Sequence, residues 1–184
     1  TPVGTDGAKN IVVTTSGGTT TSVGAFTYFS KFAVTYAGGV GSTGTAPTQI
    51  SLAPNETFTV ANGSSISKTG YTFTKWKDAG NVEYLPGATY TVTDAAVTLT
   101  AQWTLNNYNV TFTAGAHGSI SGTTPQTVDH GSSSSQVSAV PDANYHFVNW
   151  SDASTVNPRT IASVETTTSL TATFAIDTYT ATYN

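Results

Sequence analysis

The residue types that usually carry chemistry are sparse in this sequence and stand far apart. The chain has no cysteine, and its three histidines, His117, His130 and His146, lack the spacing of a metal-ligand motif. Asp129 and His130 precede a run of serines, but neighbours in an extended segment point to opposite faces, so they do not form a catalytic triad. The sequence shows no nucleophile elbow and no phosphate-binding loop. We therefore expect no enzymatic activity, no cofactor and no metal site.

Two weaker chemical features stay open. The turn sequence DAGNVE places the oxygen ligands of Asp78, Asn81 and Glu83 close together, but it lacks the Asp-x-Asp-x-Asp-Gly pattern of a calcium loop. We favour a solvated turn, with weak calcium binding as the alternative. An intramolecular isopeptide crosslink is the second open feature, and its candidate lysines are Lys9, Lys31 and Lys68.

The composition limits the partners that the chain can recognise. Charged residues make up 9% of the sequence and the formal net charge is −4, so there is no basic surface for nucleic acid or for an anionic membrane. No apolar run approaches the roughly 18 residues of a membrane helix, and we expect no membrane insertion. Abundant threonine favours strands over helices, which predicts an all-β protein.

An aromatic motif occurs twice, as YTFTKW at residues 71–76 and as YHFVNW at residues 145–150. In a regular strand Tyr71 and Phe73 share one face, whereas Trp76 has the opposite parity, and the second copy repeats this mismatch. Either a β-bulge returns the tryptophan to the core or the tryptophan packs at the joint with a neighbouring module. We favour a structural role, and the alternative is an exposed platform for a sugar or a peptide.

Strand-like alternation surrounds both copies of the motif. FAVTYAGGVGS from Phe32 matches YNVTFTAGAHGS from Tyr108, and YTATYN from Tyr179 begins the pattern again. Each full copy closes with a second alternating segment, VTLTAQW or TSLTATF. We expect at most one turn of helix, near residues 94–96. The residues predicted to form the core or the joint are Tyr71, Phe73, Trp76, Trp103, Tyr145, Phe147, Trp150 and Phe174.

These repeats divide the chain into four predicted parts. Module A spans residues 32–104 and module B spans residues 105–176, with length differences confined to loops. Residues 177–184 open a further repeat. Residues 1–31 differ from the modules and predict two strands joined by a Gly-Gly turn, which is too small a sheet to be stable alone.

The quoted segments resemble a known family of bacterial repeats. Module A, with KTGYTFTKWKDAGNVEYLPGATYTV, resembles the Listeria-Bacteroides repeat, also known as the internalin B-type B repeat, and module B resembles its divergent form. The resemblance implies small β-grasp-like units, strung along secreted or wall-attached proteins and without enzymatic activity. The sequence differs from the family at Lys75 and Asn149, where glycine is usual. Residues 1–31 resemble the C-terminal half of an immunoglobulin-like TIG domain.

We interpret the chain as non-enzymatic extracellular modules of a bacterial surface protein, acting as a stalk or an adhesive scaffold. The alternative is the subunit of an extracellular filament that is joined head-to-tail by strand addition. Expected partners are other copies of the chain, neighbouring repeats, or a surface protein or glycan. The residues that strand addition would use are Ile11, Val12, Val13, Tyr179, Ala181 and Tyr183. The chain is then either a piece of a longer array or a processed subunit.

Overall fold

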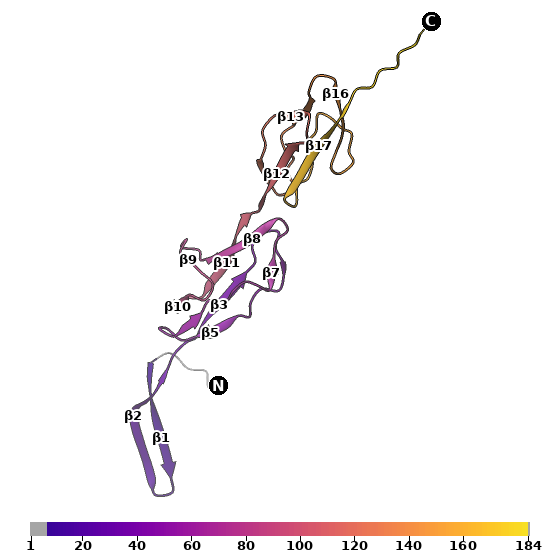
Figure 1. Ribbon diagram of the computed structural model, residues 1–184. Coiled ribbons are helices and arrows are strands. Elements are labelled where there is room, and N and C mark those ends of the chain that lie inside the picture. The colour runs from indigo at the N-terminus through magenta and orange to yellow at the C-terminus, as the bar shows by residue number, and fades with distance from the viewer. Residues whose placement is uncertain (1–6, 184) are drawn as a thin grey trace. The chain divides into compact units, whose positions relative to one another are not determined.

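The architecture is all-β. The fold was obtained as a computed structural model, in which residues 7–183 are described (Figure 1). These residues form strands, turns and loops and contain no helix, so the all-β prediction is confirmed and the single helical turn near residues 94–96 is replaced by a bend. No helix long and apolar enough to span a membrane is found among them. The chain divides between Thr104 and Leu105 into two compact units.

The first unit begins with an antiparallel hairpin. Strand β1 (Gly7–Thr15) pairs with β2 (Gly18–Tyr28) from Thr15 opposite Gly18 to Gly7 opposite Tyr28. Ser16 and Gly17 form the connecting turn, and Gly18 already belongs to β2. Within the described part of the chain these two strands form a sheet of their own.

Module A is built on a mixed sheet with the strand order β5-β3-β11-β8-β9. Its first and last long strands are parallel neighbours, with Val34 opposite Val97 and Ala37 opposite Thr100, and the outer pairs are antiparallel. The parallel pair of β3 and β11 thus lies inside the sheet, with further strands on both sides. The strands are β3 (Phe32–Ala37), β5 (Ile50–Leu52), β8 (Tyr71–Lys77), β9 (Glu83–Tyr84) and β11 (Val97–Leu105).

Parallel neighbours cannot be joined by a tight turn, so residues 38–96 form a long crossover between β3 and β11. Short antiparallel ladders give this crossover its structure, and they pair β4 (Thr43–Gly44) with β7 (Ile66–Ser67) and β6 (Thr57–Thr59) with β10 (Thr89–Thr91). Apolar side chains from the crossover pack together with those of β3 and β11 and form one core. The buried members of this core are Val34, Tyr36, Val60, Ile66, Trp76, Tyr90, Val92, Leu99 and Ala101.

Module B repeats the plan with a sheet in the order β14-β12-β17-β16. Again the first and last strands are parallel, with Val110 opposite Thr168 and Ala114 opposite Ala172. A separate ladder joins β13 (Gly118–Ser121) to β15 (Ser138–Pro141). The sheet strands are β12 (Asn107–Ala114), β14 (Gln126–Asp129), β16 (Tyr145–Trp150) and β17 (Thr168–Ile176). The buried core is Val110, Phe112, Val128, Val137, Ala139, Trp150, Val164, Leu170 and Ala172.

Candidate functional site

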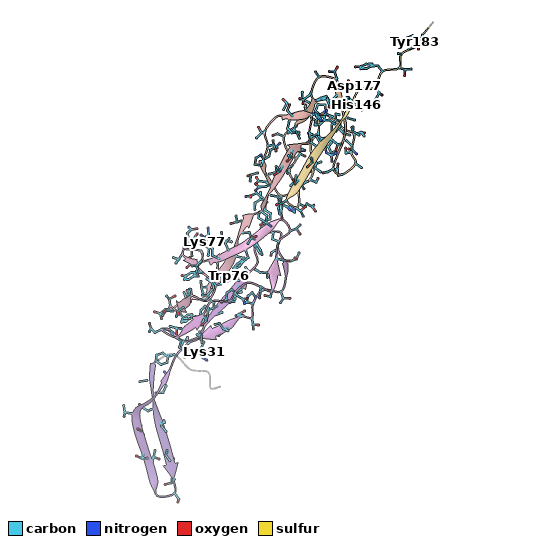
Figure 2. The ribbon with its side chains drawn as sticks, viewed as in Figure 1. Lys31, Trp76, Lys77, His146, Asp177 and Tyr183 are labelled. Atoms are coloured by element: carbon cyan, nitrogen blue, oxygen red, sulfur yellow. The ribbon has the colours of Figure 1, made fainter. Side chains whose placement is uncertain are left out.

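The two motif tryptophans lie at the centres of their modules. Trp76 and Trp150 are both fully buried, with 0% of each residue exposed, and Figure 2 labels Trp76 within module A. A tryptophan that is fully shielded from solvent offers no face to a sugar or a peptide. We call Trp76 and Trp150 the tryptophan anchors.

A β-bulge explains how the second anchor reaches the core. Along β16, Phe147 lies opposite Phe174 and Trp150 lies opposite Ala172, so three residues of β16 correspond to only two of β17. The irregularity falls between Phe147 and Asn149, where Val148 is the extra residue and is 38% exposed. Because a bulge absorbs one residue, Phe147 and Trp150 face the same side of the sheet.

The anchors are held by matching contacts in the two modules. The Trp76 indole Nε1 donates to the Ala61 carbonyl at 2.8 Å, and the Trp150 Nε1 donates to the Val156 carbonyl at 2.9 Å. In each case the acceptor lies in a loop outside the sheet, so the indole ties that loop to a strand of the sheet. An aromatic ring from the first strand packs against each anchor at a steep angle, Tyr36 at 4.7 Å and Phe112 at 5.4 Å between ring centroids.

A second aromatic pair extends each anchor towards the closing strand. Trp103 of β11 lies 5.7 Å from the ring of Phe73, and Phe174 of β17 lies 6.2 Å from the ring of Phe147. Trp103 also donates its Nε1 to the Gly38 carbonyl at 2.8 Å. Both closing aromatics are half-buried and pack on their own module's core.

The turn DAGNVE is closed by its own hydrogen bonds. Asp78 Oδ1 accepts the Val82 N–H at 2.9 Å, and Asp78 Oδ2 accepts the Tyr84 hydroxyl at 3.0 Å. Glu83 forms an ion pair with Lys75 at 2.6 Å. Burial, the hydrogen bond to Asp78 and the negative charge of Asp78 raise the pKa of Tyr84 to about 12. Burial and the same charge also raise the pKa of Tyr90.

The three histidines stand at separate places in module B. His117 has φ of 68° in a turn and stacks on Tyr145 with 4.1 Å between ring centroids. His146 Nδ1 lies 2.8 Å from Asp177 Oδ1, and Figure 2 shows this pair close together. His130 Nδ1 is buried without a hydrogen-bond partner in the described part of the chain. Within residues 7–183 no three His, Cys, Asp or Glu side chains gather into a possible metal site.

The residues expected to support strand addition are exposed. Ile11, Val12 and Val13 lie in the middle of β1 and are each about half exposed. After β17 the chain forms no further described strand through residue 183, and the side chains of Tyr179 and Tyr183 are 83% and 95% exposed. Ala181 is likewise exposed.

Side chains that replace a missing strand partner are the main feature that the sequence patterns did not predict. Asn157 accepts the Ala139 N–H at 2.9 Å and donates to the Ala139 carbonyl at 2.8 Å. The Thr124 hydroxyl likewise bonds both the N–H and the carbonyl of Phe112, at 2.7 and 2.9 Å. The buried amide of Gln126 joins two loop segments, as described below. These three polar side chains satisfy main-chain groups across gaps of 9 to 18 residues.

Comparison with protein families agrees with this repeated geometry. Residues 32–102 match the profile of the Listeria-Bacteroides repeat domain, and residues 108–178 match that of the divergent InlB B-repeat domain. Modules A and B belong to these two repeat families. B repeats of this kind are typical of bacterial surface proteins and are in general structural modules. Neither match reaches residues 1–31, so the TIG resemblance of that segment stays a prediction.

Two proteins of Evansella cellulosilytica are similar to part of the chain. One is described as a predicted membrane protein and is 31% identical over 94 residues. The other is described as a predicted Gly-rich membrane protein and is 32% identical over 95 residues. Each alignment covers 50% of this chain but only 14% and 11%, respectively, of the relative. No solved structure matches the chain.

Proposed function

We propose that the two B repeats are extracellular, non-enzymatic modules of a bacterial surface protein, and that they act as a scaffold able to bear tension. The observation that carries this proposal is the parallel pairing of the first and last strands in both modules. The family matches and the two membrane-protein relatives support the location at the cell surface.

Parallel first and last strands determine how a module responds when its two ends are pulled. The chain enters module B at the start of β12 and leaves it at the end of β17, which are opposite ends of the paired region. Tension therefore slides the two strands along each other. Because the bonds of a parallel ladder are evenly spaced, the five residue pairs from Val110–Thr168 to Ala114–Ala172 resist together. The four pairs in module A have the same geometry.

The tryptophan anchors add to this resistance. Each indole joins a loop to the sheet through one hydrogen bond to a loop carbonyl, and its ring lies in the core of its module. Sliding of the first strand past the last strand requires the ring contacts of Tyr36 with Trp76, or of Phe112 with Trp150, to break. The aromatic contacts of the core and the hydrogen bonds of the parallel ladder therefore break together.

Single-molecule force spectroscopy on the full chain tests the proposal. The chain has no cysteine, so introduced cysteines are its sole thiol attachment points. In one variant Asn107→Cys and Thr178→Cys apply force along the parallel pair of module B. In the other, Asn109→Cys and Thr167→Cys apply force at the same end of both strands and peel them apart one pair at a time. All four positions are exposed.

We expect the sliding geometry to unfold module B at a force several times that of the peeling geometry. Both variants contain two cysteines and should have the same melting midpoint, so a difference in force reports geometry and not stability. Equal forces in the two geometries at equal thermal stability would overturn the scaffold proposal.

A second candidate function is a self-assembling filament joined by strand addition between copies. The half-exposed Ile11, Val12 and Val13 of the two-stranded hairpin favour it, as do the exposed Tyr179 and Tyr183 outside any described strand. Light scattering over a concentration series and electron microscopy test this function. Regular fibres that disappear when residues 1–31 or 177–184 are deleted would support it. A chain that stays monomeric at every concentration would exclude it.

A further inference from the structure

Module B has an open polar cleft beside β14. The cleft has a volume of about 450 Å³, which lies within the range of roughly 300–1,000 Å³ typical of ligand sites. One wall is formed by β14 and Pro125, and the other by the serine-rich loop that follows the strand. Its lining residues are Thr123, Pro125, Gln126, Thr127, Val128, Asp129, Ser132, Ser133 and Ser135.

A buried side chain bridges the two walls. Gln126 is only 8% exposed, and its Nε2 donates to the carbonyls of Thr123 at 2.8 Å and Ser135 at 3.0 Å. Its Oε1 accepts the Ser135 N–H at 2.6 Å. At the same register position in module A, Ile50 faces Val34 as Gln126 faces Val110. Module B thus carries a hydrogen-bonded amide that bridges the two walls of the cleft, where module A carries an apolar side chain.

The edge of β14 has main-chain groups that face away from β12. Its pairing with β12 is antiparallel, so the N–H and C=O groups of successive residues point alternately to the two sides. Hydrogen bonds at both ends of β14 show which main-chain groups point towards β12. The His130 N–H donates to the Asn106 carbonyl, and the Thr124 hydroxyl bonds the N–H and the carbonyl of Phe112. The N–H and C=O groups of the even-numbered residues therefore point towards β12, and those of Thr127 and Asp129 point outward.

No described strand covers this outward side, because β14 is the edge of its sheet. The Asp129 carbonyl accepts the Ser132 N–H at 3.0 Å as the chain turns. Three main-chain groups then remain along the outer edge of β14 with the spacing of a strand. They are two donors and one acceptor: the Thr127 N–H, the Asp129 N–H and the Thr127 carbonyl. Such a row pairs with an added extended chain, as in other proteins that bind peptides by strand addition.

The charge of module B indicates which peptide fits. Arg159 is the single lysine or arginine in positions 105–184, and it is paired with Asp152. The acidic residues in these positions are Asp129, Asp142, Asp152, Glu165 and Asp177. Asp129 is exposed and lines the cleft, so it favours a cationic side chain on the peptide. The serine hydroxyls of the opposite wall favour small or hydroxylated residues beside that cation.

We propose that the cleft beside β14 binds an extended peptide that carries a lysine or arginine, which pairs with Thr127 as an added strand and places its cation against Asp129. The peptide residue opposite Thr127 exchanges two main-chain hydrogen bonds with it, and a neighbouring peptide carbonyl accepts the Asp129 N–H. This inference is independent of the scaffold role, which rests on the parallel strand pairs.

The test selects a displayed library of random nine-residue peptides against the full chain and measures the affinity of selected peptides by fluorescence anisotropy. We expect peptides enriched in lysine or arginine. Their affinity should fall at least tenfold with Thr127→Pro, which removes an outward N–H from an edge strand, where proline is tolerated. Asp129→Lys should also weaken them at least tenfold. In NMR spectra of the unchanged chain, bound peptide should slow hydrogen exchange at the amides of Thr127 and Asp129.

A matched change in module A provides the control. Ser51 occupies the register position in β5 that Thr127 occupies in β14, so Ser51→Pro makes the same chemical change outside the cleft and should leave peptide affinity unchanged. If Thr127→Pro lowers the melting midpoint of module B, its effect on affinity is not used. The Asp129→Lys variant and the exchange measurement on the unchanged chain then decide whether the peptide binds at β14.

The remaining outcomes overturn the proposal. These are a selection that enriches no peptide, or peptides that bind the Thr127 and Asp129 variants as tightly as the unchanged chain. Binding on a glycan array that Asp129→Lys abolishes, without any peptide binding, would assign the cleft to a polyhydroxylated ligand and reject the peptide. Selected peptides without a cationic residue would reject the role of Asp129.

Discussion

Phe147 and Trp150 face the same side of β16 although three positions separate them, because β17 advances by only two residues, from Phe174 to Ala172. The bulge at Val148 turns the motif Tyr-x-Phe-x-x-Trp into a continuous aromatic surface inside the module. The rings of Phe147 and Trp150 lie 5.6 Å apart, and those of Phe73 and Trp76 in module A lie 5.0 Å apart. The same sequence spacing thus gives the same ring contact twice.

Replacing Trp150 with alanine should destabilise module B by about 3 to 5 kcal/mol, because a fully buried aromatic side chain is removed. Chemical unfolding followed by circular dichroism measures this loss. Trp150→Phe keeps a ring but leaves the Val156 carbonyl without its indole donor, and should cost about 1 to 3 kcal/mol. An unchanged unfolding midpoint for Trp150→Ala would contradict the burial of this residue.

Replacing Trp76 with alanine should lower the stability of module A alone. Each module has its own buried core, so the effect should stay within the core that loses the side chain. Amide hydrogen exchange resolved by residue measures each module separately. Exchange should accelerate at Val34 and Leu99 and stay unchanged at Val110 and Leu170. Equal acceleration in both modules would show that the two cores unfold as one.

Alkaline conditions should destabilise module A through Tyr84. The pKa of this hydroxyl is raised to about 12 in the folded chain, above its ordinary value of 10.0. The stability contributed by the neutral hydroxyl is therefore fully present below pH 10 and is lost as the pH rises towards 12. Tyrosinate absorbance measures the titration. Asp78→Asn removes the negative charge beside the hydroxyl, so the titration of Tyr84 should move to lower pH.

Replacing Gln126 with alanine should destabilise module B by about 1 to 3 kcal/mol. The change leaves the Ser135 N–H and the Thr123 carbonyl without their partner in a partly buried place. Thermal unfolding measures the loss. Gln126→Ile copies the residue of module A at this register position and restores apolar packing without the hydrogen bonds. If both variants were as stable as the unchanged chain, the amide would not hold the cleft.

Replacing Gly118 with alanine should force the closing aromatic of module B to move. A Cβ atom at this position would come within 2.3 Å of the Phe174 ring, so the ring must shift at a cost of about 1 to 3 kcal/mol. Phe174→Leu in the same chain makes room for the new methyl group. A double-mutant cycle of the two changes should therefore show a favourable coupling. Additive effects would indicate that the two residues do not touch.

The alternating apolar residues of the sequence predict the long strands of both modules because alternation reports the face of a sheet directly. Phe32, Val34 and Tyr36 fall in β3, and Tyr108, Val110 and Phe112 fall in β12. Parity in the sequence does not decide whether a bulge or a joint between modules accommodates the tryptophans, because it cannot show where a strand absorbs an extra residue. The register of β16 with β17 resolves it for Trp150.

The polar cleft and the side chains that build it could not be predicted from spacing. Gln126 bonds Ser135, and Asn157 bonds Ala139 across 18 residues, through contacts that depend on how the crossover folds back. Glutamine and asparagine in such segments look like ordinary loop residues in the sequence. Only a comparison of the two modules indicates that Gln126 is unusual, because the corresponding position in module A holds the apolar Ile50.

The parallel pairing of first and last strands also determines when each repeat can fold during synthesis. A chain made from its N-terminus has β12 long before β17, and Val110 has no parallel partner until Thr168 has been added. Pairings between such distant residues form late and slowly. Module A, whose last parallel pair ends at Thr100, can therefore close while module B is still incomplete. The repeats become folded in chain order, and an interruption inside one repeat leaves the preceding repeat intact.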